Sequence, residues 1–137
     1  MEPLDPKSEA LRLQYLLLRE AAQKKAHQIE ARFQRRLQPL SRARDEFQRN
    51  LDHLKEQLAT GRYPKHLLAP ALLREELRLK QLDDEIQRLK EEMKMSIRNH
   101  WLQVRLKAAK MAKKRGVNLD LSEFFPEVLE DESLQKS

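Results

Sequence analysis

The sequence predicts an all-α fold, a long antiparallel helical hairpin or coiled coil with a flexible acidic C-terminal tail. Leu, Ala, Glu, Lys and Arg make up 80 of the 137 residues, a composition typical of coiled coils and long helices. Apolar side chains recur at helical spacing in two long segments, and a short proline-containing stretch separates them. Because 39% hydrophobic residues accompany 36% charged ones, the apolar side chains can seal narrow seams between helices but cannot build a thick core.

The first predicted helix covers residues 6–60, after a disordered N-terminus at residues 1–5. Asp5 can accept hydrogen bonds from the first free backbone N–H groups, and Pro6 suits the first helical position, where no donor is needed. One apolar stripe advances in thirteen steps over 47 residues, about 3.6 residues per step, the repeat of a straight α-helix. Its members are Leu11, Tyr15, Leu18, Ala22, Ala26, Ile29, Phe33, Leu37, Leu40, Ala43 or Arg44, Phe47, Leu51, Leu54 and Leu58.

Pro39 lies inside this stripe, where a proline removes one backbone hydrogen bond at a cost of about 3 kcal/mol. The stripe continues in phase from Leu37 through Leu40 to Phe47, so we expect one kinked helix rather than two helices. If the helix were split, Ser41 would cap its second half.

Residues 61–69 are predicted to form the loop between the two helices. Gly61 can adopt the left-handed conformation that ends many helices, and Pro64 and Pro70 follow within nine residues. A loop of about nine residues between helices of similar length favours an antiparallel hairpin.

The second predicted helix covers residues 70–115 and ends at Gly116. Apolar steps of three and four alternate from Leu79 to Met93, as in a coiled-coil seam, and two steps of four then lead to Trp101. We expect the seam to be formed by Leu79, Leu82, Ile86, Leu89 and Met93 together with Phe33, Phe47, Leu51 and Leu54. The place of Trp101 on the stripe favours its burial in the seam over stacking on bases or anchoring a partner.

The C-terminal half of the second helix is basic. Residues 94–115 contain eight Lys and Arg residues and no acid, while residues 116–137 carry a net charge of −5 and residues 1–115 carry +11. Such positive charge attracts an acidic protein surface or nucleic-acid phosphates. The residues expected to bind an anionic partner are Arg105, Lys107, Lys110, Lys113, Lys114 and Arg115. The alternatives are that these side chains only complement the helix dipole or that the acidic tail folds back over them.

The tail, residues 116–137, loses the helical stripe and combines acids with a small apolar cluster. We expect the tail to be flexible in isolation. Its apolar residues are expected to dock into a groove of a partner, and they are Phe124, Phe125, Val128 and Leu129. The alternative is that they cover the end of the chain's own hairpin.

No group of residues predicts catalysis, a cofactor or a metal ion. The chain has no cysteine, which excludes thiolate nucleophiles and zinc sites built on thiolates. Its four histidines have no metal-ligand spacing, and its two glycines cannot build a phosphate-binding loop. We therefore expect a protein that is not an enzyme and has no small-molecule substrate.

From the N-terminal residues we expect neither a secretory signal nor an Arg-rich transit peptide. The longest uninterrupted apolar run, residues 15–18, is far shorter than the roughly 20 residues that span a bilayer. The expected location is the cytoplasm or the nucleus, with no membrane span.

Several leucines lie outside the two stripes, so the apolar part of each helix surface is wider than a two-helix seam requires. These leucines are Leu13, Leu16, Leu17, Leu73, Leu77, Leu102 and Leu106. A continuous exposed apolar patch marks an interaction surface. The sequence therefore predicts a coiled-coil adaptor, scaffold or structural subunit that binds other helical proteins or itself, with a cytoskeletal or ciliary assembly as one setting. The alternative is a nucleic-acid- or ribonucleoprotein-binding protein that uses residues 94–115.

Overall fold

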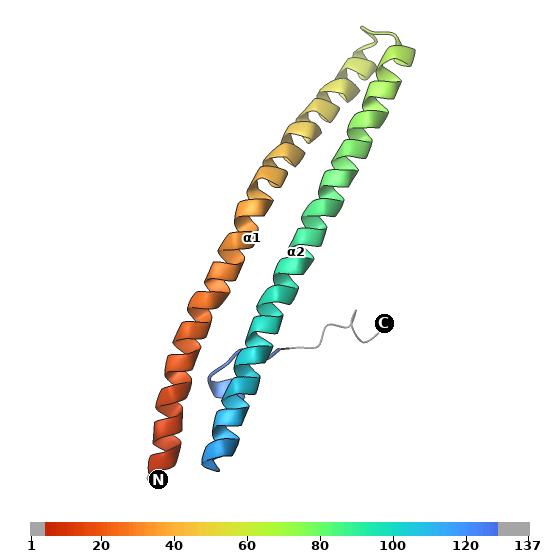
Figure 1. The fold of residues 1–137 in the computed structure, drawn as a ribbon. Coiled ribbons are helices and arrows are strands. Elements are labelled where there is room, and N and C mark those ends of the chain that lie inside the picture. The colour runs from red at the N-terminus through yellow and green to blue at the C-terminus, as the bar shows by residue number, and fades with distance from the viewer. Residues whose placement is uncertain (1–4, 129–137) are drawn as a thin grey trace, which may run out of the picture. The chain divides into compact units, whose positions relative to one another are not determined.

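The computed structural model describes residues 5–128, and over this range the chain forms helices and no strand. Helix α1 spans Pro6–Thr60, helix α2 spans Lys65–Arg115, and a short 3-10 helix, η1, spans Leu121–Glu123. The prediction of an all-α helical hairpin is confirmed (Figure 1). The chain divides into two compact units, which we call the terminal unit (Met1–Glu30 with Lys94–Ser137) and the loop unit (Ala31–Met93).

The two ends of α1 satisfy some of the backbone groups that have no partner inside the helix. The Asp5 carbonyl accepts a hydrogen bond from the Glu9 N–H at 3.0 Å, and this bond begins the helix. At the other end Gly61 has a φ of +68°, a left-handed conformation that glycine adopts without steric cost. Its N–H donates to the Leu58 carbonyl at 3.3 Å, so the glycine both ends α1 and turns the chain.

Both long helices contain a proline. Helix α1 runs through Pro39 without interruption, so it is not split there, and the nearby Leu37 is buried. Helix α2 begins at Lys65, five residues before the predicted start at Pro70, and the loop therefore comprises residues 61–64. Pro70 lies near the helix start, where its missing N–H forfeits a single backbone hydrogen bond, and the helix accommodates that loss.

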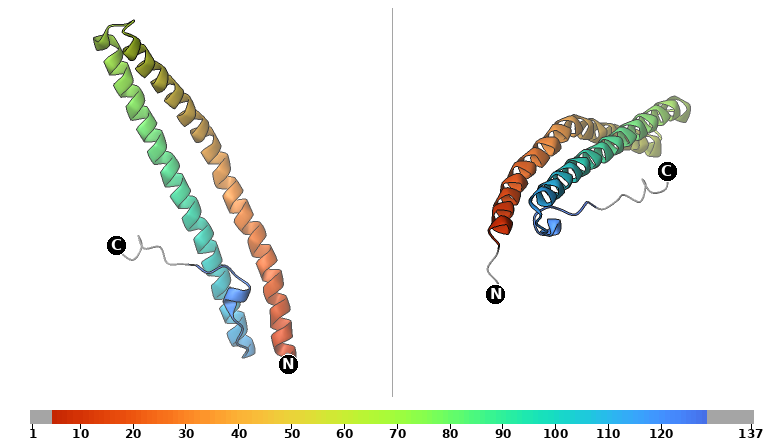
Figure 2. Two further views of the ribbon diagram at one scale, coloured as in Figure 1. Left: turned by 180° about the vertical axis from the view of Figure 1, so that it is seen from behind. Right: turned by 60° about the horizontal axis from the view of Figure 1, so that its bottom comes forward.

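In the loop unit, residues 31–60 of α1 pack against residues 65–93 of α2 in opposite directions (Figures 1 and 2). Leu51 and Leu89 are 3% and 2% exposed. The other residues expected in this seam are half-buried, namely Phe33, Phe47, Leu54, Leu79, Leu82, Ile86 and Met93. The Arg44 guanidinium on α1 donates to the Asp83 carboxylate on α2 at 2.9 Å, a polar contact that favours this register of the two helices.

In the terminal unit, residues 6–30 of α1 pack against residues 94–115 of α2, and residues 117–128, the C-terminal segment, lie beside α2 (Figures 1 and 2). All three parts contribute buried residues to one core. These are Leu11, Tyr15, Ala22, Trp101, Val104, Ala108, Phe124 and Phe125. Trp101 is 9% exposed, so it lies in the seam. None of the helices between residues 5 and 128 is sufficiently long and apolar to cross a membrane.

The chain reverses direction after α2 at Gly116, which has a φ of +66°. The Gly116 N–H donates to the Lys113 carbonyl at 3.2 Å, and the Val117 N–H donates to the Ala112 carbonyl at 3.0 Å. This pair of bonds is the Schellman arrangement, which is usually accompanied by an apolar contact across the turn. Val117 and Ala112 both pack against the core. The turn thus directs the C-terminal segment back along α2.

Candidate binding surfaces

Tyr15 is the centre of the terminal unit. Its side chain is fully buried, as is Ala108 on the facing helix. The Tyr15 hydroxyl donates to the Ala108 carbonyl oxygen at 2.6 Å, because a side chain as small as that of alanine leaves this part of the α2 backbone accessible. Burial raises the pKa of the Tyr15 phenol above its ordinary value of 10.0. The phenol is therefore held in its neutral, donating form.

Two aromatic residues of the C-terminal segment pack directly on Tyr15. The Phe124 and Phe125 ring centroids lie 5.3 and 5.4 Å from that of Tyr15, and both pairs are arranged edge to face. This is a favourable geometry for aromatic pairs. Phe124 is 6% exposed and Phe125 is 2% exposed. The segment therefore contributes to the core rather than lying loosely on its surface.

Two arginines hold the C-terminal segment from the helices. The Arg105 Nη1 atom donates to the carbonyl oxygens of Phe125 and Pro126, each at 3.2 Å. The Arg12 guanidinium lies 5.4 Å from the Phe124 ring centroid, a cation–π distance, and its Nη2 atom is 3.9 Å from a Glu123 carboxylate oxygen. The ion pair is largely exposed and contributes little by itself. The carbonyl contacts orient the backbone of the segment.

The prediction of a flexible tail therefore differs from the structure at residues 117–128. Phe124 and Phe125, expected to dock on a partner, are buried against the chain's own helices, and Val128 is half-buried beside them. Leu129 lies outside the described residues. The physical reason is that two helices alone cannot cover Tyr15, and the turn at Gly116 returns an apolar segment to that place. Covering the end of the hairpin, the alternative interpretation, describes these residues better.

The residues expected to bind an anionic partner do not all lie in the same environment. Arg105 is engaged with the backbone of the C-terminal segment, and Arg115 is half-buried. Four lysines on the C-terminal part of α2 are exposed: Lys107, Lys110, Lys113 and Lys114. Residues 93–119 contain no acid, so these four lysines form a basic surface on α2 that no carboxylate of that helix end neutralises.

A shallow groove of about 230 Å³ lies between α1 and α2 in the terminal unit. Leu18, Ala22 and Val104 form apolar parts of its lining, and Lys25 and Lys107 add positive charge. The groove is also lined by His100, whose Nε2 atom lies 2.8 Å from the Ala22 carbonyl oxygen and so joins the two helices. No carboxylate lines this groove, and no residue of the C-terminal segment does so.

Nine large apolar side chains among the described residues are exposed, by 36% to 70% of their area. They are Leu13, Leu16, Leu17, Tyr63, Leu67, Leu73, Leu77, Leu102 and Leu106. All seven leucines outside the predicted stripes belong to this set, and the stripe residues themselves are buried or half-buried. The exposed leucines therefore lie on faces of the helices that the seam does not use.

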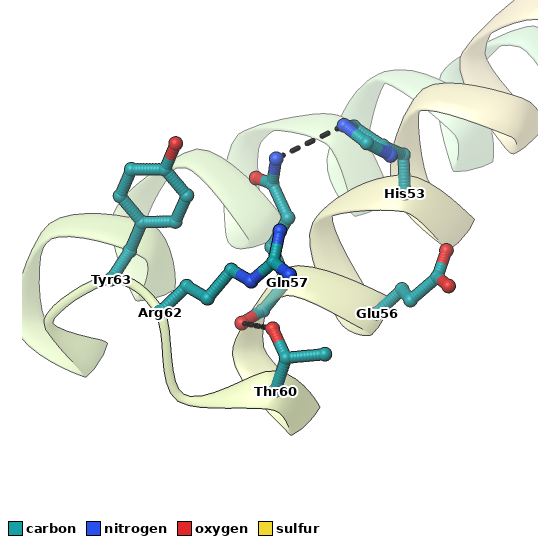
Figure 3. A pocket seen from close by; sticks show the side chains of 6 residues that line it. All are labelled: His53, Glu56, Gln57, Thr60, Arg62 and Tyr63. Carbon is teal, nitrogen blue, oxygen red and sulfur yellow. Dashed lines mark hydrogen bonds between the residues drawn. The ribbon is translucent and has the colours of Figure 1, made fainter.

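A second shallow pocket, of about 270 Å³, lies where α1 meets the hairpin loop. Figure 3 shows the Gln57 amide beside the His53 ring and the Thr60 hydroxyl beside the Gln57 carbonyl. The Gln57 and His53 side-chain nitrogens are 3.0 Å apart, and the Thr60 hydroxyl donates to the Gln57 carbonyl at 2.9 Å. These contacts join residues three or four apart on one helix, so they support the end of α1. Within residues 5–128, no group of three or more His, Asp or Glu residues is placed to hold a metal ion.

The helical periodicity places Tyr15 and Ala108 on the apolar stripes of the two helices but indicates no specific contact for either, and no pattern singles out Arg12. Tyr15 carries a signal, because it is a bulky aromatic in a stretch of the stripe otherwise made of leucine and alanine. A ring at such a position needs a matching space, and Ala108 provides it from the other helix. Only the fold shows that these two positions face each other.

No protein-family model matches this chain, and no curated protein or solved structure does so either.

Proposed function

We propose that this protein is a non-enzymatic helical adaptor or structural subunit that binds other helical proteins. One observation carries the proposal: leucines outside the seam are exposed in clusters at helical spacing. Leu13 and Leu17 are 63% and 68% exposed, and they are four residues apart on α1. Residues four apart lie on one face of a helix. An apolar face of this kind is what a partner helix contacts when it packs in a groove or bundle.

The same spacing recurs on α2. Leu73 and Leu77 form a four-residue pair in the loop unit, and Leu102 and Leu106 form another in the terminal unit. Isolated exposed leucines are normal on protein surfaces, but pairs and triplets that share a face form a patch. Each unit thus has its own apolar surface for a partner. We propose a cytoskeletal or ciliary assembly as the setting of this binding.

The basic residues of the terminal unit support an acidic partner for the same adaptor. The described residues of this unit contain thirteen Lys and Arg residues against seven Asp and Glu residues. The groove lined by Leu18, Val104 and Lys107 combines apolar contact with positive charge. A helix with apolar residues on one face and acids beside them has the complementary chemistry.

Charge substitutions on the exposed leucines test the adaptor proposal. Replacing Leu13 and Leu17 with Glu should leave the helix content unchanged, because both side chains are exposed, and should reduce binding of an apolar-surface dye. It should also abolish any self-association seen by sedimentation. Leu11→Glu is the matched control, since Leu11 is fully buried and its replacement should unfold the terminal unit. A wild-type chain that sediments as a stable monomer at micromolar concentration, without dye binding, would contradict the proposal.

A second candidate function is binding of nucleic acid through residues 94–115. The observation in its favour is the exposure of Lys107, Lys110, Lys113 and Lys114 on a helix end without acids. Binding through phosphates would weaken steeply as salt concentration rises, because each contact releases a counterion. Replacing Lys110, Lys113 and Lys114 with Glu should abolish that binding with helicity nearly unchanged. Weak, salt-insensitive binding of the wild-type chain to generic RNA and duplex DNA would eliminate this candidate.

A further inference from the structure

The C-terminal segment is bound to the two helices in the way that a peptide ligand is bound to a receptor. Its aromatic anchors, Phe124 and Phe125, enter the space beside Tyr15. Its backbone is held by Arg105, which donates to two successive carbonyl groups. Its acid Glu123 faces Arg12. Anchors, backbone contacts and complementary charge are the three elements of peptide recognition by a groove.

The segment keeps its own local shape with few bonds. The Asp120 carboxylate accepts a hydrogen bond from the Ser122 N–H at 3.0 Å and so caps η1. The Phe125 N–H donates to the Leu121 carbonyl at 2.9 Å. These bonds join residues two to four apart, so a free peptide of the same sequence can form them. The contacts that seat the segment come instead from α1 and α2.

Most of the contacts on the helix side do not depend on the segment belonging to this chain. Arg105 donates hydrogen bonds to backbone carbonyl groups, which every peptide contains. Tyr15 and Arg12 contact ring faces and edges, which any aromatic side chain presents. The covalent link is a single turn at Gly116. Recognition therefore depends mainly on two adjacent aromatic residues, and an acid beside them adds a weaker contact with Arg12, whichever chain supplies the segment.

We propose that the surface formed by Arg12, Tyr15 and Arg105 is a receptor site for an acidic segment with two adjacent aromatic residues in a partner protein. The chain's own C-terminal segment occupies this site, and the partner binds by displacing it. The inference rests on the proposed adaptor function, since it names the chemistry of one partner. The site consists of other residues than the exposed leucines, so substitutions can test the two separately.

Displacement is opposed by the covalent attachment of the segment. A segment tethered through a short connection competes at an effective concentration of about 1 mM. To displace the tethered segment, a partner segment must bind the site more tightly or must make a second contact elsewhere on the adaptor. The wild-type chain should consequently bind a free peptide of this kind weakly, and a chain whose own segment is disabled should bind it well.

The test uses the full-length chain and a labelled peptide with the sequence of residues 117–128, VNLDLSEFFPEV. The variant Phe124→Ala/Phe125→Ala keeps the whole chain but removes both anchors of its own segment. Fluorescence anisotropy should show the peptide binding this variant on the order of 100-fold more tightly than the wild-type chain, because the tethered competitor is lost. The same peptide with alanine at both aromatic positions should bind neither protein.

Matched changes on the helices identify the site. In the double variant, Arg105→Ala should weaken peptide binding by about 10-fold, because two hydrogen bonds to the peptide backbone are lost. Arg49→Ala should leave binding unchanged, since Arg49 is an exposed arginine of the loop unit. Equal effects of the two substitutions would overturn the assignment of the site.

A double variant that retains helix content and does not bind the peptide would overturn the proposal. If the double variant loses helix content, the wild-type chain provides the test instead. Unlabelled peptide at several millimolar should then accelerate hydrogen exchange at the chain's own Phe124 and Phe125 amides, and unchanged exchange there would overturn the proposal. Neither failure affects the adaptor proposal, whose test uses Leu13 and Leu17.

Discussion

The terminal unit and the loop unit are built from the same two helices, but different elements cover the apolar side chains between those helices. Eight residues of the terminal unit are buried in one core, and four of them are aromatic, namely Tyr15, Trp101, Phe124 and Phe125. In the loop unit the buried apolar residues are Leu37, Leu51 and Leu89, and the rest of its seam is half-buried. The loop unit has two helical layers, whereas the terminal unit has a third part, the C-terminal segment.

This difference shows what two packed helices can and cannot do. A pair of helices buries one narrow stripe of each, and side chains at the stripe edges keep contact with water. A bulky ring such as Tyr15 can be fully buried only if a third element covers it. The C-terminal segment supplies that cover, and Arg105 donates hydrogen bonds to two of its backbone carbonyl groups.

The largest expected effect is a charge in the loop-unit seam. Leu89→Asp places a carboxylate at a position that is 2% exposed, which removes apolar contacts and buries an unpaired charge. We expect it to lower the free energy of unfolding of the loop unit by about 4 kcal/mol or more. Urea unfolding followed by circular dichroism measures this change in stability. Leu73→Asp, at a position that is 70% exposed, should leave the free energy of unfolding nearly unchanged. Equal losses of stability in the two variants would contradict the burial of Leu89 in the seam.

The next effect compares aromatic residues in the two units. Phe125→Ala should lower the free energy of unfolding of the terminal unit by about 3 kcal/mol, because Phe125 is 2% exposed and its loss leaves a cavity beside Tyr15. Phe47→Ala in the half-buried loop-unit seam should lower the free energy of unfolding of the loop unit by less. Trp101 fluorescence reports the terminal unit and circular dichroism reports both units. A larger loss for Phe47→Ala would reverse the comparison.

A pH-dependent effect is expected from Tyr15. Because burial raises the pKa of its phenol above 10.0, the neutral form contributes stability that is fully present below pH 10 and is lost as pH rises through the raised value. Tyr15→Phe removes the hydrogen bond to Ala108, at a cost of about 1 kcal/mol near neutral pH. It should also flatten the fall in urea midpoint above pH 10, measured by Trp101 fluorescence. An equally steep fall in the variant would assign that transition to other groups, such as the lysines of α2.

The smallest expected effect concerns the ion pair of the loop unit. Arg44 and Asp83 are joined at 2.9 Å, but their side chains are 34% and 48% exposed. Exposed pairs contribute between about 0.2 and 1 kcal/mol. A double-mutant cycle of Arg44→Gln and Asp83→Asn should give a coupling free energy in that range, smaller at high salt. A coupling free energy that salt does not change would argue against an electrostatic contact.

The all-α fold and the buried stripes follow from the sequence because both depend on local periodicity. A repeat near 3.6 residues fixes which side of a helix is apolar, and every stripe position from Leu11 to Leu58 is buried or half-buried. The leucines outside the stripes are exposed for the same reason, since their spacing places them on other faces. The first residue of a helix is harder to predict from sequence. Pro70 does not mark the start of α2, because a helix accepts a proline within its early turns as well as at its first position.

The position of the C-terminal segment did not follow from the sequence. Its acids and its lack of a helical stripe indicate a flexible tail, and its apolar cluster has no periodicity that points to a partner surface. What decides its position is non-local: Tyr15 and Ala108 are 93 residues apart and define the space that Phe124 and Phe125 fill. Arg105 illustrates the same limit, because a basic residue on a basic helix gives no sign that it contacts backbone carbonyls.

Hydrogen exchange of the full-length chain, followed by mass spectrometry, tests most directly whether the terminal unit is a three-part core. We expect the amides of Phe124 and Phe125, which donate to the Leu121 carbonyl at 3.1 and 2.9 Å, to be protected together with residues 101–108 of α2. We also expect Phe124→Ala/Phe125→Ala to remove protection from the segment while the loop unit keeps its own. Exchange of residues 121–125 at the rate of an unstructured peptide, with residues 101–108 still protected, would contradict a three-part core.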